Sequence, residues 1–425
     1  MDNSQDTFII HSAAELVTCG PSRGPRAGAS QADAGIIHNG AVAVLGDKIV
    51  GVGPTEDIMA RFKGEDTDLI DATGKTLTPG LVDAHTHLIW AGWRDEEYEM
   101  RLKGATYLEI MQAGGGIMST VSATRLAPEE ELIRLAKPRL ERMLAYGTTT
   151  VEIKSGYGLS VEDELKSLRA IRSLDEELQA AGSGPRIAAT FLGAHAVPAE
   201  YKGKEDEYVD LVCNDMLPQV ASERLAEWCD AFCDVGAFDA EQTRRILSTA
   251  KDLGLGTRLH ANEFARVGAA QLAAEMGCSS ADHLLVMEQE DIDALKEGGV
   301  VAVLLPGTPL GLGLGSYAPA RALIEAGVPV ALATDCNPGT CPSENLALMI
   351  SLACSQMTMT PAEAIVAATI NSACSLNRGE SIGSLEAGKL ADIVLWDAPN
   401  HRHLAYHFGV NLAEMVFVGG RRLQI

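Results

Sequence analysis

The chain has 425 residues, of which 46% are hydrophobic and 22% are charged, a composition typical of a folded globular protein. This length leaves room for a barrel of roughly 250 residues and a second module. The formal net charge of -24 argues against nucleic acids and anionic membranes as partners, because both bind to positively charged surfaces.

The amino-terminal segment predicts a cytoplasmic protein. It has no basic region followed by a long apolar run, so it resembles neither a secretory signal nor a transit peptide. No window approaches the roughly 18 uninterrupted apolar residues that a membrane span requires. The nine cysteines include no pair at CxxC spacing, and we expect them to be free thiols in a reducing compartment.

Short β-type runs fill residues 1–78, among them Ala41–Leu45 and Lys48–Val52, with Gly, Asp and Pro between them as in hairpins. From Leu81 onward, β-branched runs alternate with longer segments of helical period, which is typical of βα units around a parallel sheet. Eight such strands are predicted, at Leu81–His87, Thr148–Lys154, Ile187–His195, Cys229–Asp234, Arg258–His260, Ser280–His283, Val300–Leu305 and Val328–Asp335.

Eight is the strand number of a (β/α)8 barrel. Helices are predicted between and after the strands, at Pro128–Tyr146, Val161–Ala181, Ala240–Leu253, Val267–Met276, Ala318–Ala326, Ser343–Met357 and Pro361–Ser375. Strand-like pieces return at Asp392–Trp396 and Glu414–Val418, and Gly311–Gly315 is predicted to be a loop. We therefore expect a TIM-like barrel over residues 79–387, inserted into a small β-sandwich domain formed by residues 1–78 and 388–425.

Two histidines, His85 and His87, end the first predicted barrel strand. Residues two apart face the same side of a strand, so both imidazoles can meet one cation. A His-x-His pair is a weak motif by itself, because polar residues are common at strand ends. Its place at the C-terminal face of the barrel, where this fold holds its active sites, favours a functional role.

Other polar residues end further predicted strands at the same face: His195, His260, His283 and Asp335. Five of the ten histidines thus lie at predicted strand ends, more than a random distribution along the chain would place there. A structural histidine is the usual reading of His260 alone. Together with His85, His87 and Asp335, however, it completes a set of three nitrogens and one oxygen that suits zinc or iron.

The run Pro79–His87, PGLVDAHTH, resembles the opening barrel strand of the amidohydrolase superfamily. Longer blocks resemble the imidazolonepropionase family within it, at Arg94–Arg125, Glu152–Leu159, Thr190–Pro198, Ala331–Thr340 and Tyr406–Arg421. The resemblance therefore covers nearly the whole chain. Asn262 departs from the pattern, because the family often carries an acid between the residues that correspond to His260 and Glu263.

The resemblance implies hydrolysis of the anionic 4-imidazolone-5-propanoate to N-formimidoyl-L-glutamate, the third step of histidine degradation. It implies one divalent metal per chain, Zn2+ or iron as Fe2+ or Fe3+, held by His85, His87, His260 and Asp335. Such a metal lowers the pKa of its water toward ~7 and polarises a carbonyl group. A homodimer is also implied, and homodimers are common among soluble oligomers.

Catalytic and substrate-binding roles are expected at the same face. Asp335 would take a proton from water, and His283 would hydrogen-bond the carbonyl oxygen as the oxyanion forms. Glu263 would relay a proton or bond a ring nitrogen of the substrate. The propanoate would meet Arg94, whose fork matches a carboxylate better than lysine does. The remaining predicted substrate contacts are Tyr107, Tyr157, His195, Asn337, Gly339 and Thr340.

Other functions remain open at this point. A deaminase of a guanine-like amino-heterocycle suits the same histidines and aspartate, and ammonia release would separate it from the ring-opening hydrolase. A cyclic-imide hydrolase with two metals is disfavoured, because Lys154 falls on the second strand and the fourth, ending at Asp234, has no lysine. A catalytically silent barrel would hold no tightly bound metal.

Overall fold

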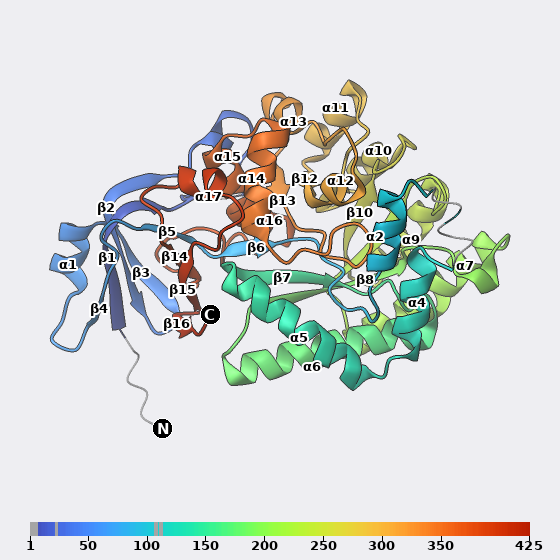
Figure 1. The fold of residues 1–425 in the computed structure, drawn as a ribbon, viewed down its shortest axis with the longest axis horizontal. Helices are drawn as coiled ribbons and strands as arrows, with labels where there is room; N and C mark the ends of the chain where they lie inside the picture. The colour runs from blue at the N-terminus through green and yellow to red at the C-terminus, as the bar shows by residue number, and fades with distance from the viewer. Residues whose placement is uncertain (1–6, 22–23, 106–108, 110–113) are drawn as a thin grey trace.

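The computed structural model of the chain describes residues 7–21, 24–105, 109 and 114–425. These described residues form a parallel barrel of eight strands and, beside it, a mixed sheet built from both chain ends (Figure 1). None of the helices in these residues combines the length and the hydrophobicity of a membrane span.

The barrel strands follow one another in chain order, and each is hydrogen-bonded to the next. They are β6 (Leu81–Asp83), β7 (Thr148–Lys154), β8 (Arg186–Ala194), β9 (Trp228–Cys233), β10 (Gly256–Ala261), β11 (Ser280–His283), β12 (Val301–Leu304) and β13 (Val330–Leu332). The predicted strands are confirmed, with ends that move by a few residues. Every residue of β7 and β11 is buried, because helices cover the outside of the barrel and side chains fill its interior.

The barrel closes between β6 and β13 at the level of the predicted site. The carboxylate of Asp83 accepts hydrogen bonds from the backbone N and the Oγ1 of Thr334, at 3.0 and 2.6 Å. Further along, the backbone N of Asp335 donates to the carbonyl oxygen of His85 at 3.0 Å. Residues from the first and last strands are therefore held side by side by the closure itself.

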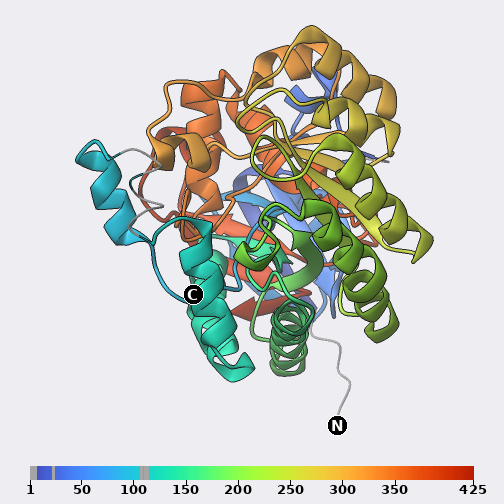
Figure 2. The same ribbon diagram turned by 90° about the vertical axis from the view of Figure 1, so that its right-hand side faces the viewer.

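Helices surround the strands, as Figure 2 shows from the barrel side. The outer helices that were predicted are α5 (Glu129–Ala145), α6 (Val161–Ala181), α9 (Ala240–Asp252), α10 (Ala269–Glu275), α13 (Ala320–Ala326) and α14 (Leu346–Met357). Further helices are α2 (Asp95–Leu102), α4 (Ile117–Leu126), α7 (Glu205–Leu211), α8 (Leu217–Glu223), α11 (Gln289–Gly298), α12 (Gly307–Leu312) and α17 (Arg402–Tyr406). The helix predicted over Pro361–Ser375 is helical throughout, but a π-turn over Ala367–Asn371 divides it into α15 (Pro361–Val366) and α16 (Ser372–Ser375).

The prediction of a loop over Gly311–Gly315 is wrong at its start, because Gly311 lies in α12. A Cβ atom at Gly311 would come within 1.9 Å of the carbonyl oxygen of Thr340. The glycine therefore allows the helix to pack closely against the loop that follows β13, and only the next glycine, Gly313, ends the helix with a left-handed φ of 68°.

The mixed sheet joins the two chain ends. Its order is β16-β15-β14-β5-β1-β2-β3, with β4 paired to β1. The strands are β1 (Thr7–Val17), β2 (Ile36–Leu45), β3 (Lys48–Pro54), β4 (Asp68–Asp71), β5 (Thr76–Pro79), β14 (Ile393–Trp396), β15 (Ala413–Val418) and β16 (Arg421–Leu423). In Figure 1 the blue N-terminal strands and the red C-terminal strands accordingly lie together.

This sheet curls around a core of its own, in agreement with the predicted small sandwich. Phe8 and Phe417, from opposite chain ends, stack with ring centroids 5.2 Å apart. Ile58, from the short helix α1 (Thr55–Phe62), packs on the other face against Ile9. We retain the limits at residues 78/79 and 387/388 as proposed domain boundaries.

Candidate metal centre and active site

The predicted ligands His85, His87, His260 and Asp335 meet at the C-terminal end of the barrel. The Nε2 atoms of His85 and His87 lie 3.6 and 3.4 Å from Oδ1 of Asp335. The Nε2 atom of His260 lies 3.3 Å from that of His87. None of these residues is more than 3% exposed, so the cluster is shielded from bulk water.

These side chains fit a single metal ion. Ligand atoms at tetrahedral positions about 2.1 Å from one centre lie roughly 3.4 Å from each other. The separations that join Asp335 to His85 and His87, and His87 to His260, are 3.3 to 3.6 Å and agree with this spacing. The buried Nε2 of His85 has no hydrogen-bond partner among the described residues. Leaving such an atom unpaired costs about 1–3 kcal/mol, and a bond to a metal would remove that cost.

Carboxylates bind the opposite nitrogens of two histidines. The Nδ1 of His85 donates to Oδ2 of Asp282 at 2.6 Å, and the Nδ1 of His260 lies 3.0 Å from Oδ2 of Asp230. These contacts favour a proton on Nδ1 and leave Nε2 free for a metal. Burial also holds the pKa of His85 and His87 well below the usual value, so both rings are neutral, as metal binding requires.

Sequence reasoning missed Asp230, Asp282 and Thr308. Thr308, in α12, donates from Oγ1 to Oδ2 of Asp335 at 2.5 Å. The two aspartates carried a usable signal, because a charged residue inside the apolar runs WCDAFC and SADH is rarely buried without a partner. Thr308 carried no such signal, since an isolated threonine is common anywhere.

His283 and Glu263 lie together at the ends of β11 and β10. The Nε2 of His283 is 3.7 Å from Oε2 of Glu263, and neither ring nitrogen of His283 has a hydrogen-bond partner among the described residues. Burial lowers the pKa of His283 to about 3. Burial, reinforced by the nearby charges of Asp335 and Asp234, raises the pKa of Glu263 well above its usual value. A neutral imidazole and a protonated carboxyl group can both donate hydrogen bonds to a substrate.

The backbone turns sharply where the strands end. Asn262, His283 and Asp335 have left-handed φ angles of 52°, 78° and 55°. Non-glycine residues adopt this conformation at a cost of order 1–3 kcal/mol, and such strain gathers at functional sites. Asn262, the departure from the family pattern, donates from Nδ2 to the carbonyl oxygen of Val286 at 3.0 Å and so anchors the loop after β11.

Arg94 and Gly339 bring the loops after β6 and β13 together. A Cβ atom on Gly339 would lie 2.2 Å from Nη1 of Arg94, so a side chain at this position would displace the guanidinium. Arg94 also pairs with Glu97 at 2.9 Å. Arg101, which the sequence did not single out, donates from Nη2 to the carbonyl oxygen of Gly339 at 3.2 Å. This junction therefore holds two guanidinium groups within the described residues.

Asn337 shapes the loop after Asp335. Its Oδ1 accepts hydrogen bonds from the backbone N of Gly339 and of Thr340, both at 2.8 Å. Its Nδ2 donates to the carbonyl oxygen of Asp335 at 2.7 Å and to Oγ1 of Thr340 at 2.8 Å. The amide group is thus engaged within the loop, and Thr340 in turn reaches Oδ2 of Asp335 at 3.4 Å.

His195 and Tyr157 lie beside His87, one of the proposed metal ligands. The ring of His195 stacks on that of His87 with centroids 4.8 Å apart, and the ring of Tyr157 lies 5.9 Å from His87. The Nδ1 of His195 is 3.0 Å from the carbonyl oxygen of Gly156, which fixes the proton on that nitrogen. Tyr107, also predicted to bind substrate, lies outside the described residues.

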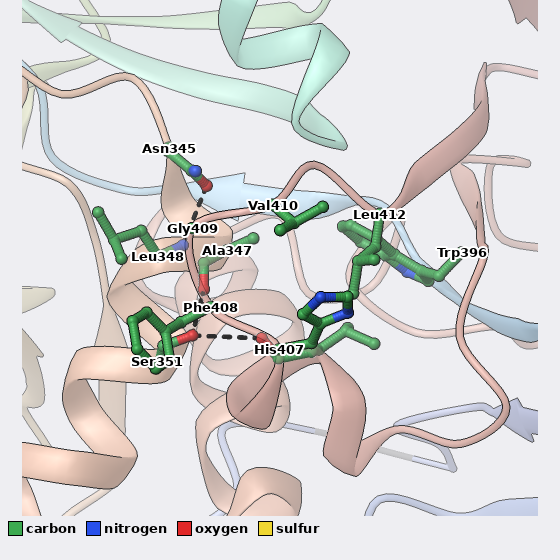
Figure 3. Close-up of a pocket in the computed structure, with 11 residues that line it drawn as sticks. Asn345, Ala347, Leu348, Ser351, Trp396, His407, Phe408, Gly409, Val410 and Leu412 are labelled. Atoms are coloured by element: carbon green, nitrogen blue, oxygen red, sulfur yellow. Dashed lines mark hydrogen bonds between the residues drawn. The ribbon is translucent and has the colours of Figure 1, made fainter.

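A separate hollow lies between α14 and the segment that follows α17 (Figure 3). Leu348, Trp396, Phe408 and Leu412 form its apolar lining, and Ser351 and His407 are among its polar residues. None of the predicted site residues lines it. The hollow is therefore distinct from the predicted active site at the C-terminal ends of the barrel strands.

Comparisons with known proteins agree with this geometry. A model of the amidohydrolase family matches residues 76–423. The imidazolonepropionase of Alkaliphilus oremlandii (strain OhILAs) is 49% identical over 97% of this chain and 96% of its own length. That of Geobacillus kaustophilus (strain HTA426) is 50% identical, with 97% of each chain covered.

Solved structures share the fold at lower identity. The triazine hydrolase from Arthobacter aurescens superposes with a TM-score of 0.74 at 19% identity, covering 98% of this chain and 94% of that one. A zinc-bound adenosine deaminase from Xanthomonas campestris has a TM-score of 0.69 at 21% identity, covering 98% and 92%. The family match and the curated relatives carry the assignment: the chain belongs to the amidohydrolase family and, within it, to the imidazolonepropionase family.

Proposed function

We propose that the protein hydrolyses 4-imidazolone-5-propanoate to N-formimidoyl-L-glutamate, the third step of histidine degradation. The observation that carries this proposal is the buried cluster of His85, His87, His260 and Asp335 in a chain that is 49–50% identical to imidazolonepropionases over 97% of its length. Hydrolysis of a cyclic amide needs an activated water and a polarised carbonyl group, and such a cluster can supply both.

We assign one divalent metal, zinc or iron, to the cluster. When bound, it would acidify water and polarise the ring carbonyl. The proposed ligand atoms of His85, His87, His260 and Asp335 cluster around one point, which supports a single ion.

In the proposed reaction a water oxygen bonds to the ring carbonyl carbon, and the bond from that carbon to the ring nitrogen breaks. Asp335 takes a proton from the water. His283, whose ring is neutral, donates an N–H to the carbonyl oxygen as negative charge develops there. Glu263, whose pKa burial raises well above its usual value, delivers a proton to the departing nitrogen. One proton thus leaves the water and one reaches the nitrogen.

The decisive test uses freshly made imidazolone propanoate and follows the ultraviolet absorbance of its ring while ammonia is assayed in the same tube. We expect absorbance to fall without ammonia release. Chelation or His85→Ala should abolish the change, since either removes the metal. Ammonia release would indicate a deaminase instead, and unchanged absorbance with metal bound would reject the proposed substrate.

We further propose that Arg94 binds the propanoate. Arg94→Ala should raise KM roughly 10–100-fold with a smaller effect on kcat, because charge-assisted hydrogen bonds to a carboxylate would be lost. Arg94→Lys should lie between, since lysine cannot form a two-pronged contact. Steady-state kinetics with an imidazolone that lacks the propanoate provides the control. An equal penalty for both substrates would contradict this role, and thermal unfolding checks that loss of the Glu97 pair leaves the fold intact.

We also propose that the protein is a cytoplasmic homodimer. The likeness to the imidazolonepropionase family and the frequency of two-fold dimers among soluble oligomers support this state. Light scattering coupled to size-exclusion chromatography would test it, and a monomer mass of 45.0 kDa across the concentration range would reject it.

A further inference from the structure

An ionic layer lies inside the barrel behind the histidine cluster. Its members come from four strands and are fully buried: Glu152 and Lys154 from β7, Asp230 from β9, Arg258 from β10 and Asp282 from β11. Branched aliphatic residues usually fill this part of a (β/α)8 barrel. Charged groups here need an explanation, because a buried ion pair often stabilises a fold no better than apolar residues of the same size.

One arm of the layer runs from Lys154 to His260. The Nζ of Lys154 lies 2.9 Å from Oδ2 of Asp230 and 2.8 Å from Oε1 of Glu152. Asp230 holds His260 at two points, since Oδ2 is 3.0 Å from Nδ1 of the ring and Oδ1 accepts the backbone N–H at 3.1 Å. The lysine therefore orients a carboxylate that fixes both the backbone and the ring of one proposed ligand.

The other arm runs from Arg258 to His85. The Nη2 of Arg258 lies 3.3 Å from Oδ2 of Asp282, and the same oxygen accepts the Nδ1–H of His85 at 2.6 Å. Arg258 also donates from Nη2 to the carbonyl oxygen of Ala84 at 2.8 Å. Arg258 thus positions the ring of His85 through Asp282, and it also bonds directly to the backbone of Ala84, the residue before His85.

Glu152 joins the layer to the His-x-His pair. Its Oε1 contacts Lys154, and its Oε2 accepts the backbone N–H of Thr86 at 3.1 Å. Thr86 stands between His85 and His87, so this bond fixes the turn that presents both imidazoles. Every member of the ionic layer therefore contacts a proposed ligand, or the backbone next to one, directly or through one partner.

An ion pair elsewhere in the chain, with one buried and one half-buried partner, offers a contrast. Arg186, at the start of β8, bonds Asp392 at 3.0 Å and ties the barrel to the mixed sheet. Asp392 is only 3% exposed and also accepts the backbone N–H of Gly419. This pair joins two parts of the fold and touches no proposed ligand in the described structure, so it serves as a control.

We propose that Lys154 and Arg258 are positioning residues for the metal centre. Each holds a carboxylate in the orientation that turns one histidine ring, so that Nε2 of His260 and of His85 face a common point before any metal arrives. The inference rests on the proposed function through the metal centre itself, and it predicts that removing either cation weakens metal binding although neither residue is a ligand.

The test measures Co2+ binding to the metal-stripped protein, by calorimetry for Kd and by visible absorption for coordination geometry. Lys154→Met and Asp230→Asn should each raise the Kd for Co2+ about 10–100-fold and change the visible spectrum. Mutation of the partners of ligand histidines usually weakens metal binding by this amount. The double variant should bind about as weakly as the weaker single variant, since both substitutions act through His260. Arg258→Met and Asp282→Asn should form a second such pair through His85.

Arg186→Met is the control. It should lower the melting temperature while leaving the Kd for Co2+ and the visible spectrum unchanged. Unchanged Kd and spectra in the folded Lys154 and Arg258 variants would overturn the proposal and leave the layer a purely structural role. Wild-type protein that binds no Co2+ would instead reject the metal centre itself, so the two failures are distinguishable.

A second experiment uses the wild-type, metal-free protein and therefore tests the proposal even where a methionine variant does not fold. Nitrogen-15 NMR of labelled histidines reports which ring nitrogen carries the proton, with assignments made by single His→Gln variants. We expect His85 and His260 to carry it on Nδ1 already without metal, because Asp282 and Asp230 face that atom. A proton on Nε2 in either ring would overturn the proposed positioning.

Discussion

Asp335→Asn is expected to lower kcat by about 1000-fold or more while the protein stays folded. Oδ1 of Asp335 lies within 3.6 Å of the Nε2 atoms of His85 and His87, and Oδ2 accepts the hydroxyl hydrogen of Thr308. One carboxylate thus serves as a proposed ligand and as the proposed acceptor of the water's proton. Asparagine has nearly the same size but is a poorer ligand and a far weaker base.

Steady-state ultraviolet assays, with metal content measured by elemental analysis, check this expectation. Asp252→Asn, at the exposed end of α9, is the matched control and should leave kcat unchanged. Full metal content with a large loss of kcat would assign the loss mainly to proton transfer. A variant that keeps a rate within threefold of the wild type would contradict both proposed roles.

Glu263→Gln is expected to lower kcat by about 100-fold and to leave KM nearly unchanged. Glutamine keeps the hydrogen-bonding shape of the protonated carboxyl group but has no acidic proton to give to the departing ring nitrogen. Glu263→Ala should lose a similar factor in kcat and raise KM as well. Glutamine activity close to that of the wild type would show that the side chain only binds a ring nitrogen.

The dependence of kcat on pH gives Glu263 a second test. Burial raises its pKa well above the usual value, so the acidic form persists to a higher pH than in an exposed glutamate. A proton donor works below its pKa, and kcat should therefore fall as pH rises through the raised value. Glu263→Gln should remove this alkaline decline, while Glu297→Gln, an exposed change on α11, should preserve it. An alkaline decline that survives in Glu263→Gln would assign it to another group.

The amino-acid pattern was sufficient to predict the barrel and the residues at its mouth. Alternation of β-branched runs with helical segments predicted the eight strands, and parallel strands around a barrel end at one face. The strand pattern therefore predicted that His85, His260 and Asp335 lie at one site, although about 250 positions separate the first from the last. Periodicity is a local property, and local properties were enough for this step.

Contacts between individual side chains could not be predicted in this way, because they depend on how the strands are placed in three dimensions. Asp230 contacts His260 from the neighbouring strand β9, Asp282 contacts His85 from β11 across the barrel, and Thr308 reaches Asp335 from α12. Barrel closure sets the relative height of strands that are distant in sequence, and so decides these contacts. Gly311 shows the same limit, since a glycine required for close packing against Thr340 has the same local pattern as a glycine in a loop. Strand period specifies the face on which a side chain lies, whereas its partner depends on the register and closure of the whole barrel.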